Sequence, residues 1–349
     1  MERCKRIGIL TGGGDCPGLN AAIRAVTKSA LKAGYEVIGF RDGWKGFIED
    51  KNELLDSVKI SGIIDKGGTI LGTSRFSPLG IENGPQMVLD GFKELGLAGL
   101  VVMGGDGTLS IAGKLSRLGL PVVGIPKTID NDVMGTDYSI GFQTAVQIAT
   151  NALDRLRSTA ESHHRIMLLE VMGRCAGWIA TYAGLANGAD AILIPEIPLD
   201  EEKLNDLCRM VKGRNKVGKR FSIIVVAEGT KLERKDNSER VLDVNEKEKS
   251  TISGWVGGVI AKIIEEKTGL ETRFSSLDYI QRGGTPVAYD RNLATSFGLK
   301  ATKLVQEGKF GEMAAIKGNR ITSVSLEEVV DKVKTVNMNV YRIAEMFFG

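Results

Sequence analysis

The sequence predicts an α/β fold with mainly parallel β-sheets. Short apolar runs at residues 7–10, 100–103 and 122–125 each end abruptly in a polar loop. A segment with helical periodicity, residues 109–118, separates the second run from the third, which is the pattern of a strand–helix–strand unit. With 349 residues, the chain is also long enough to form two domains with large hydrophobic cores.

Further apolar runs and periodic segments continue this alternation along the chain. Pro17 stands near the start of the first helical segment, where proline is favoured because its missing N–H is not needed. Apolar residues from Ile140 to Leu156 recur at helical spacing and predict a long helix that crosses into a second domain. The last forty residues are expected to hold one short strand and one or more helices. The expected strands are residues 7–10, 37–40, 100–103, 122–125, 166–171, 189–194 and 221–227, and the expected helices are about 18–33, 85–95, 109–118, 140–156, 175–186, 200–212, 253–268 and 286–307.

Composition excludes several classes of protein. The net charge of +3 is too close to neutral to indicate a nucleic-acid or membrane-surface partner. The N-terminus has no apolar signal core, and no run approaches the ~20 apolar residues that span a membrane. The four cysteines lack CxxC spacing and are expected to be reduced thiols of a cytoplasmic protein. Because His163 and His164 are the only histidines, a histidine metal site or a Ser-His-Asp triad is not expected.

Two polar loops carry the strongest functional signal. The first, residues 104–108, has the sequence GGDGT, and the second, residues 126–132, has the sequence PKTIDND. Each follows a predicted strand, and ligands bind outside the carboxyl ends of such strands. Glycines and a helix N-terminus favour phosphate binding, and Asp106 could hold a divalent cation bound to phosphates. Asp130 and Asp132 supply carboxylates, one of which could accept a proton from a hydroxyl, so the loops together indicate phosphoryl transfer to an alcohol.

Each of these motifs also has a simpler structural interpretation. The GGDG sequence could be a tight turn, and the DND sequence could be a capping or turn cluster. Arg75, at the end of a glycine-rich segment, could be a solvated surface cation. Arg174 could pair with a nearby carboxylate. The glycine-rich loop at 12–14 has neither GxGxxG nor GxxxxGK[ST] spacing, so it indicates neither a dinucleotide-binding fold nor a P-loop NTPase.

The set of motifs resembles the 6-phosphofructokinase family. GGDGT followed by PKTIDND, with TGGGDCPGLNAAIR upstream and EVMGR and IQRGG downstream, is similar to that family in order from about residue 7 to residue 315. The resemblance implies two Rossmann-like α/β/α domains with mainly parallel sheets and an active site in the interdomain cleft. The implied boundaries are a nucleotide or phosphoryl-donor domain at 1–140 plus about 280–325, a fructose 6-phosphate domain at 141–279, and a C-terminal helical extension at 326–349.

The resemblance also implies roles for single residues. Asp130 matches the base that takes the proton from the 1-hydroxyl of fructose 6-phosphate, and Arg174 matches an arginine near the transferring phosphate. Thr128 and Asp132 match supporting neighbours, and Asp106 matches the aspartate associated with Mg²⁺. The ATP side is implied to comprise Gly13, Arg75, Phe76, Asp106, Gly107 and Thr108. The sugar side is implied to comprise Thr128, Asp130, Arg165, Met172, Gly173, Arg174, Glu228, Arg273, Tyr279 and Arg282.

In the family, the arginines matching Arg165 and Arg273 reach the 6-phosphate from a neighbouring subunit. The active protein is therefore expected to be a homotetramer or homodimer that works in cytoplasmic glycolysis. Tyr279 stands where bacterial allosteric ATP enzymes commonly have histidine, and its hydroxyl can still donate a hydrogen bond to phosphate. The charged segment at 231–250 is expected to be a solvated surface excursion.

The phosphoryl donor is where the family motifs disagree. The pyrophosphate-using branch typically has aspartate at the position of Gly107 and lysine at that of Lys127, whereas the familiar ATP-using bacterial enzymes have glycine at both. This chain has glycine at 107, as the ATP-using enzymes do, and lysine at 127, as the pyrophosphate-using branch does. This combination resembles a mixed-substrate subgroup. Glycine at 107 leaves space for the rest of a nucleotide, so ATP is the expected donor and pyrophosphate the alternative. Two further alternatives are a kinase of the NAD kinase type, which shares GGDGT alone, and a non-catalytic subunit, which a lost base or metal carboxylate would indicate.

Overall fold

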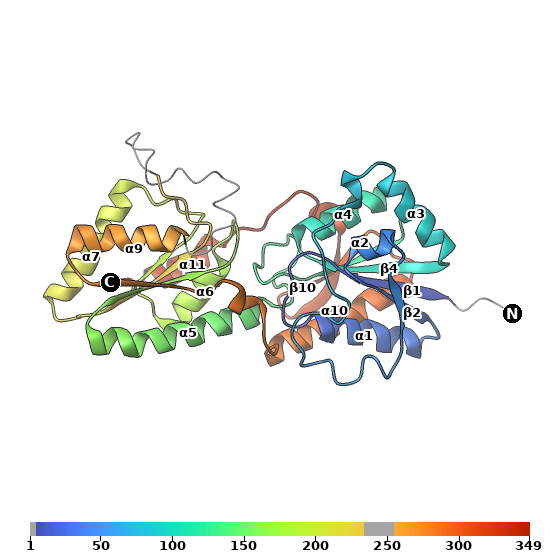
Figure 1. The fold of residues 1–349 in the computed structure, drawn as a ribbon, viewed down its shortest axis with the longest axis horizontal. Coiled ribbons are helices and arrows are strands. Elements are labelled where there is room, and N and C mark those ends of the chain that lie inside the picture. The colour runs from blue at the N-terminus through green and yellow to red at the C-terminus, as the bar shows by residue number, and fades with distance from the viewer. Residues whose placement is uncertain (1–4, 234–254) are drawn as a thin grey trace. The chain divides into compact units, whose positions relative to one another are not determined.

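The computed structural model describes residues 5–233 and 255–349, which divide into two compact units (Figure 1). Unit 1 comprises the chain up to Thr144 together with Arg282–Lys334, and unit 2 comprises Ala145–Gln281 together with Thr335–Gly349. Most of the charged segment predicted at 231–250, and the first two residues of the helix predicted at 253–268, lie outside the described residues.

Unit 1 contains a seven-stranded sheet of order β11-β10-β5-β4-β1-β2-β3. The five inner strands are parallel, and an antiparallel strand closes each edge. The inner strands are almost wholly buried, as their continuous apolar runs require. In chain order the strands are β1 (Arg6–Thr11), β2 (Glu36–Phe40), β3 (Asn52–Leu55), β4 (Leu97–Gly104), β5 (Val122–Pro126), β10 (Glu312–Lys317) and β11 (Arg320–Ser325).

Helices cover both faces of this sheet (Figure 1). On one face α1 (Leu19–Lys32) packs against α10 (Ala288–Gln306), so closely that a Cβ on Gly298 would lie 2.6 Å from the Cβ of Ala25. The other face carries α2 (Trp44–Ile48), α3 (Gly84–Glu94) and α4 (Asp106–Arg117). The side chains of these helices complete a core that includes Phe40, Trp44, Val88, Leu100, Leu109 and Val122.

Unit 2 contains a four-stranded parallel sheet of order β7-β8-β6-β9. Its strands are β6 (Ile166–Val171), β7 (Ala191–Leu193), β8 (Ser222–Ala227) and β9 (Thr272–Ser276). Helix α5 (Phe142–His163) begins in unit 1 and continues into unit 2. Helix α6 (Trp178–Asn187) packs with α11 (Met338–Glu345), and α7 (Glu201–Lys216) packs with α9 (Trp255–Thr268).

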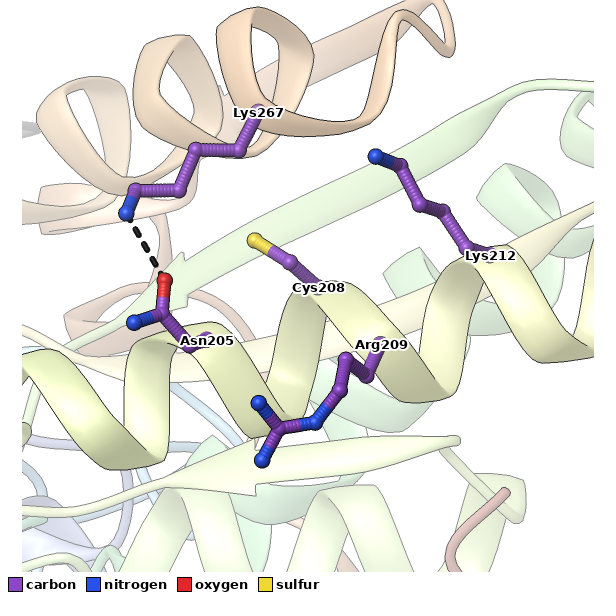
Figure 2. A pocket seen from close by; sticks show the side chains of 5 residues that line it. All are labelled: Asn205, Cys208, Arg209, Lys212 and Lys267. Atoms are coloured by element: carbon purple, nitrogen blue, oxygen red, sulfur yellow. Dashed lines mark hydrogen bonds between the residues drawn. The ribbon is translucent and has the colours of Figure 1, made fainter.

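A small groove of about 270 Å³ lies between α7 and α9 (Figure 2). It is lined by Asn205, Cys208, Arg209, Lys212 and Lys267, none of which belongs to the motifs singled out from the sequence. The Lys267 ammonium donates a hydrogen bond to the Asn205 side chain (2.7 Å), and Arg209 pairs with Asp206. Two of the three cations in the groove are therefore already engaged within the protein.

The predicted α/β fold with mainly parallel sheets is confirmed, and the differences lie at edges and ends. The edge strand β3 and the short helix α2 were not predicted, because β3 is largely exposed and has no apolar run. The last forty residues form a β10–β11 hairpin where one strand was expected. Residues 326–349 hold only the turn Leu326–Glu328 and α11 as helical elements. No helix among the described residues has the length and apolar character needed to cross a membrane.

Candidate active site

Three loops of unit 1 meet at the carboxyl ends of the adjacent strands β1, β4 and β5. The strands are in register there, since Thr11 pairs with Met103 and Gly104 pairs with Pro126. The connection after β1 leads toward β2 and the connection after β4 leads toward β5, in opposite directions along the sheet. Open α/β sheets bind ligands at such a point.

The loop after β1 is held from both sides by main-chain hydrogen bonds. The N–H of Gly12 donates to the Met103 carbonyl (2.9 Å), and the N–H of Gly13 donates to the Ser74 carbonyl (2.9 Å). Gly13 has φ of 81°, a conformation that favours glycine. Because both N–H groups bond within the protein, they fix the shape of the loop and leave contact with a ligand to its other atoms.

Arg282, which was predicted on the sugar side, lies in unit 1 beside this loop. Its guanidinium is mostly buried and lies against Gly14, where a Cβ would be 2.5 Å from the Nη1 atom. The same nitrogen donates to the Asp15 carbonyl (3.4 Å). A side chain at 14 would require this guanidinium to move.

The loop after β4 leads directly into α4, whose first residue is Asp106. A Cβ on Gly107 would meet no atom within 4 Å, so the space in front of this position is open. Thr108 has the opposite environment. Its side chain is buried, and a Cβ on Gly12 or Gly104 would lie within 3 Å of it. Thr108 therefore packs the two loops together, while the space beside Gly107 is open.

A divalent cation bound to phosphates would fit at Asp106. Mg²⁺ keeps most of its waters and is usually held by one or two carboxylates together with substrate phosphates. Among residues 5–233 and 255–349, no three His, Cys, Asp or Glu side chains gather into a metal site of their own. Asp106, the first residue of α4, supplies one carboxylate of this kind.

The loop after β5 places two carboxylates in buried positions. Asp130 and Asp132 are each 2% exposed. The Thr128 hydroxyl donates to one carboxylate oxygen of Asp130 (3.1 Å) and accepts the N–H of the same residue (3.2 Å). Asn131, with φ of 53°, accepts the N–H of Ser139 (3.0 Å) through its side chain. These bonds fix the orientation of the Asp130 carboxylate.

Lys127, in the same loop, is fully buried. Its ammonium group donates to the carbonyls of Gly12 (2.8 Å) and Gly14 (2.5 Å), and therefore ties the loop after β5 to the loop after β1. Burial lowers the pKa of Lys127. In this structure the ammonium charge is directed at main-chain oxygens rather than at open space.

Two further predicted donor-side residues follow the glycine-rich segment at 67–72. Arg75 is exposed and has no hydrogen-bond or ion-pair partner among the described residues. Phe76 is partly buried and packs against the hydrophobic core of unit 1. Arg75 is thus available to an anion, whereas Phe76 supports the segment that carries it.

In unit 2, the predicted residues Met172, Gly173 and Arg174 form a loop directly after β6. The N–H groups of Gly173 and Arg174 donate to the same carboxylate oxygen of Glu228 (3.2 and 2.8 Å). Met172 donates its N–H to the side chain of Gln281 (2.7 Å), a residue that the sequence did not single out within IQRGG. Glu228, predicted to bind the sugar, therefore also supports this loop.

Arg165 and Arg273 lie at the other end of the same sheet. Arg165 immediately precedes β6, and Arg273 is the second residue of β9, which pairs with β6. Both pair with Glu271, and the Arg165 guanidinium lowers the pKa of that carboxyl. Six residues of β6 separate Arg165 from the 172–174 loop, which corresponds to about 20 Å, and Arg273, which pairs with Met167, lies about 15 Å from the loop along the sheet.

The remaining predicted residue, Tyr279, is 68% exposed and lies in the turn after β9. Cys16, Cys175 and Cys208 are free thiols, as expected, while Cys4 lies outside the described residues.

Comparison with known proteins places the chain among sugar-phosphate kinases. The family model described as phosphofructokinase matches residues 6–305. A protein of Clostridium perfringens named ATP-dependent 6-phosphofructokinase 2 is 48% identical over 354 residues, covering 97% of this chain and 95% of the relative. A protein of Amycolatopsis methanolica named pyrophosphate–fructose 6-phosphate 1-phosphotransferase is also 48% identical, covering 99% of this chain and all of the relative.

Among solved structures, Pichia pastoris phosphofructokinase in the T-state superposes with a TM-score of 0.83 at 31% identity. The match covers 99% of this chain and 37% of the Pichia chain, so this chain spans little more than a third of that larger protein.

Proposed function

The chain belongs to the phosphofructokinase family, and on that premise we propose that it is an ATP-dependent 6-phosphofructokinase of glycolysis. It would transfer the γ-phosphoryl group of ATP to the 1-hydroxyl of fructose 6-phosphate and release fructose 1,6-bisphosphate and ADP. Unit 1 would hold the phosphoryl donor and the base, and unit 2 would supply groups that recognise the sugar phosphate.

One observation carries this proposal. The buried Asp130, oriented by Thr128, follows β5, and the neighbouring strand β4 leads into Asp106 and Gly107. A base and a phosphate-facing helix N-terminus therefore occupy neighbouring strand ends, as transfer to an alcohol requires.

The reaction would transfer one phosphoryl group to the sugar and one proton to the enzyme. The 1-hydroxyl oxygen forms a bond to the γ-phosphorus while the bond from that phosphorus to the bridging oxygen breaks, and the hydroxyl proton passes to Asp130. Arg174 would stabilise the charge on the transferring group, because a planar guanidinium suits phosphate oxygens. Asp106 would hold Mg²⁺, which would supply positive charge that neutralises the phosphates.

ATP is favoured over pyrophosphate by two features of unit 1. The open space at Gly107 would admit the remainder of a nucleotide. Lys127, which matches the pyrophosphate-using branch, already bonds to the carbonyls of Gly12 and Gly14 and so need not neutralise a bound pyrophosphate. Pyrophosphate remains the second candidate donor because Lys127 is present and a relative of equal identity bears that name.

Arg165 and Arg273 support the proposal that two copies of the chain share each sugar site. They lie about 15–20 Å along the sheet from the 172–174 loop, so one chain is not expected to bring these arginines and the loop to one fructose 6-phosphate. We infer a cytoplasmic homodimer or homotetramer in which a neighbouring subunit supplies these two arginines to the 6-phosphate.

Two measurements test this function. ³¹P NMR of a reaction with fructose 6-phosphate, Mg²⁺ and ATP should show fructose 1,6-bisphosphate, and the absence of any new sugar phosphate would refute the assignment.

The second measurement tests whether two subunits share each site. Arg273→Ala and Asp130→Asn chains should each be nearly inactive alone. Co-expressed, they should regain part of the activity, because a hybrid interface holds one intact site. Absence of recovery in confirmed hybrid oligomers would refute the shared site.

A further inference from the structure

We propose that Gln281 is a positioning residue, whose side-chain oxygen fixes the backbone of the 172–174 loop and thereby directs the Arg174 guanidinium. The inference rests on the proposed role of Arg174 at the transferring phosphate. It concerns a side chain that lies wholly inside unit 2 and has no part in the function proposed above.

The first support is the position of the loop in the sheet. Strand β6, which precedes the loop, lies between β8 and β9. The residues that directly follow β8 and β9 also bond to β6. The Glu228 N–H donates to the Val171 carbonyl (2.9 Å), and the Leu277 N–H donates to the Glu170 carbonyl (3.1 Å). Each neighbour then contributes one side-chain acceptor to the loop, Glu228 from one side and Gln281 from the other.

The second support is that the three consecutive N–H groups of the loop are all bound by these two side chains. Met172 donates to Gln281 (2.7 Å), while Gly173 and Arg174 donate to Glu228. Hydrogen bonds to a backbone segment on both sides restrict its position more than one bond does. Loss of the Gln281 oxygen would leave the buried Met172 N–H without its acceptor.

The third support is the conformation that these bonds hold. Gly173 has φ of 146°, and a Cβ there would lie 2.5 Å from the Ala176 carbonyl. Arg174 has φ of 52°, in the left-handed region that non-glycine residues seldom adopt. Such a conformation persists when surrounding groups over-determine it, and it is found disproportionately at functional sites. Relaxation of Arg174 would turn its side chain in a new direction.

The fourth support is the environment of Gln281 itself. The residue is fully buried, and its Nε2 atom has no hydrogen-bond partner among the described residues. Burying an amide with an unsatisfied donor is unfavourable. The hydrogen bond from the Met172 N–H to its oxygen is therefore the interaction that explains why an amide side chain is buried here.

A double-mutant cycle tests the inference. Gln281→Met keeps the side-chain length but removes the acceptor, and it should lower kcat about 10- to 100-fold, as a misdirected group near the reaction does. The KM for ATP should change little, because the donor groups lie in unit 1. Arg174→Ala should lower kcat further, and the double variant should match Arg174→Ala within about twofold. Gln281→Glu, which keeps an oxygen acceptor, should restore most of the activity.

Controls separate positioning from general destabilisation. Tyr341→Phe removes another hydrogen bond of unit 2, from the Tyr341 hydroxyl to the Ile192 carbonyl (2.9 Å), and should leave kcat unchanged. Hydrogen exchange should be faster in Gln281→Met at the amides of residues 172–174 but not throughout the sheet. If Gln281→Met does not fold, Gln281→Asn serves instead, because its shorter side chain moves the acceptor oxygen away from the Met172 N–H.

Several results would overturn the inference while the proposed function stood. These are wild-type kcat in Gln281→Met, unaltered amide exchange at 172–174, multiplicative effects in the double variant, or full activity in Arg174→Ala. A wild-type protein that forms no fructose 1,6-bisphosphate with either donor would instead refute the proposed function, and the inference with it.

Discussion

Replacing Gly107 with aspartate should convert an ATP-accepting site into one that rejects ATP. The position is the second residue of α4, and a Cβ there meets no atom within 4 Å, so the side chain fits without displacing any neighbour. An acidic residue in the first turn of a helix is stabilising by about 0.3–1 kcal/mol. The variant is therefore expected to be at least as stable as the wild type, and any loss of ATP use would reflect the site.

The size of the effect follows from charge. A carboxylate about 5 Å from an α-phosphate, at an effective dielectric constant near 20, is repelled by roughly 3 kcal/mol for one unit charge. Position 107 is exposed, so solvent and salt screen part of this repulsion. We expect kcat/KM for ATP to fall about 10- to 100-fold, while kcat/KM for pyrophosphate, which has no α-phosphate, should not fall.

The assay measures fructose 1,6-bisphosphate formation while ATP and pyrophosphate are varied separately. Gly107→Asn has the same shape without the charge and separates repulsion from simple filling of space. ATP kinetics within about threefold of wild type in Gly107→Asp would refute the view that this position admits the nucleotide.

Two other variants test parts of the site, and a third tests Lys334, whose ammonium donates hydrogen bonds to the carbonyls of Thr136 and Asp137 (2.8 and 3.0 Å). Asp130→Asn should lower kcat by about 10²–10⁴-fold with fructose 6-phosphate affinity by calorimetry nearly unchanged, and an undiminished kcat would exclude Asp130 as the base. Lys127→Met should lower the free energy of unfolding in urea by about 1–3 kcal/mol, because the carbonyls of Gly12 and Gly14 lose their buried donor; equal stability would contradict this role. Burial lowers the pKa of Lys334 from 10.5 to about 8, so between these values the unfolded chain binds one more proton than the folded chain. The stability of wild type relative to Lys334→Met should therefore rise by about 3 kcal/mol from pH 8 to pH 10.5, and a pH-independent difference would contradict the assignment.

The sequence predicted those features that depend on local pattern. Apolar runs that stop at polar residues located the ends of β4 and β5, and with them Asp106 and Asp130. The parallel arrangement followed from strands alternating with helices, which the sheet order bears out. These signals are local because an apolar run and the periodicity of apolar residues can both be read from residues that are adjacent in the sequence.

The sequence did not predict contacts between distant segments. Gln281 supports Met172 across 109 positions, and Lys127 reaches Gly12 across 115. Nothing in the composition around Gln281 distinguishes its side-chain oxygen from that of a surface glutamine. Its role follows only from the pairing of β9 with β6, which brings the turn after β9 beside the 172–174 loop.

Lys127 shows that a residue type alone does not reveal the environment of its side chain. As a lysine beside a phosphate-binding loop it suggests an anion ligand, and in the family motifs it suggests pyrophosphate. The structure instead gives its ammonium two main-chain acceptors in a fully buried position. A buried ammonium must be hydrogen-bonded, and here the loop after β1 supplies the oxygens.

The most direct test of the central claim is kcat/KM of the wild-type protein for ATP and for pyrophosphate, each with saturating fructose 6-phosphate and Mg²⁺. The open position at Gly107 and the engaged Lys127 predict turnover with ATP that exceeds turnover with pyrophosphate by at least about tenfold. Preferential turnover with pyrophosphate would contradict the account and would make Lys127, rather than Gly107, the residue that sets the donor.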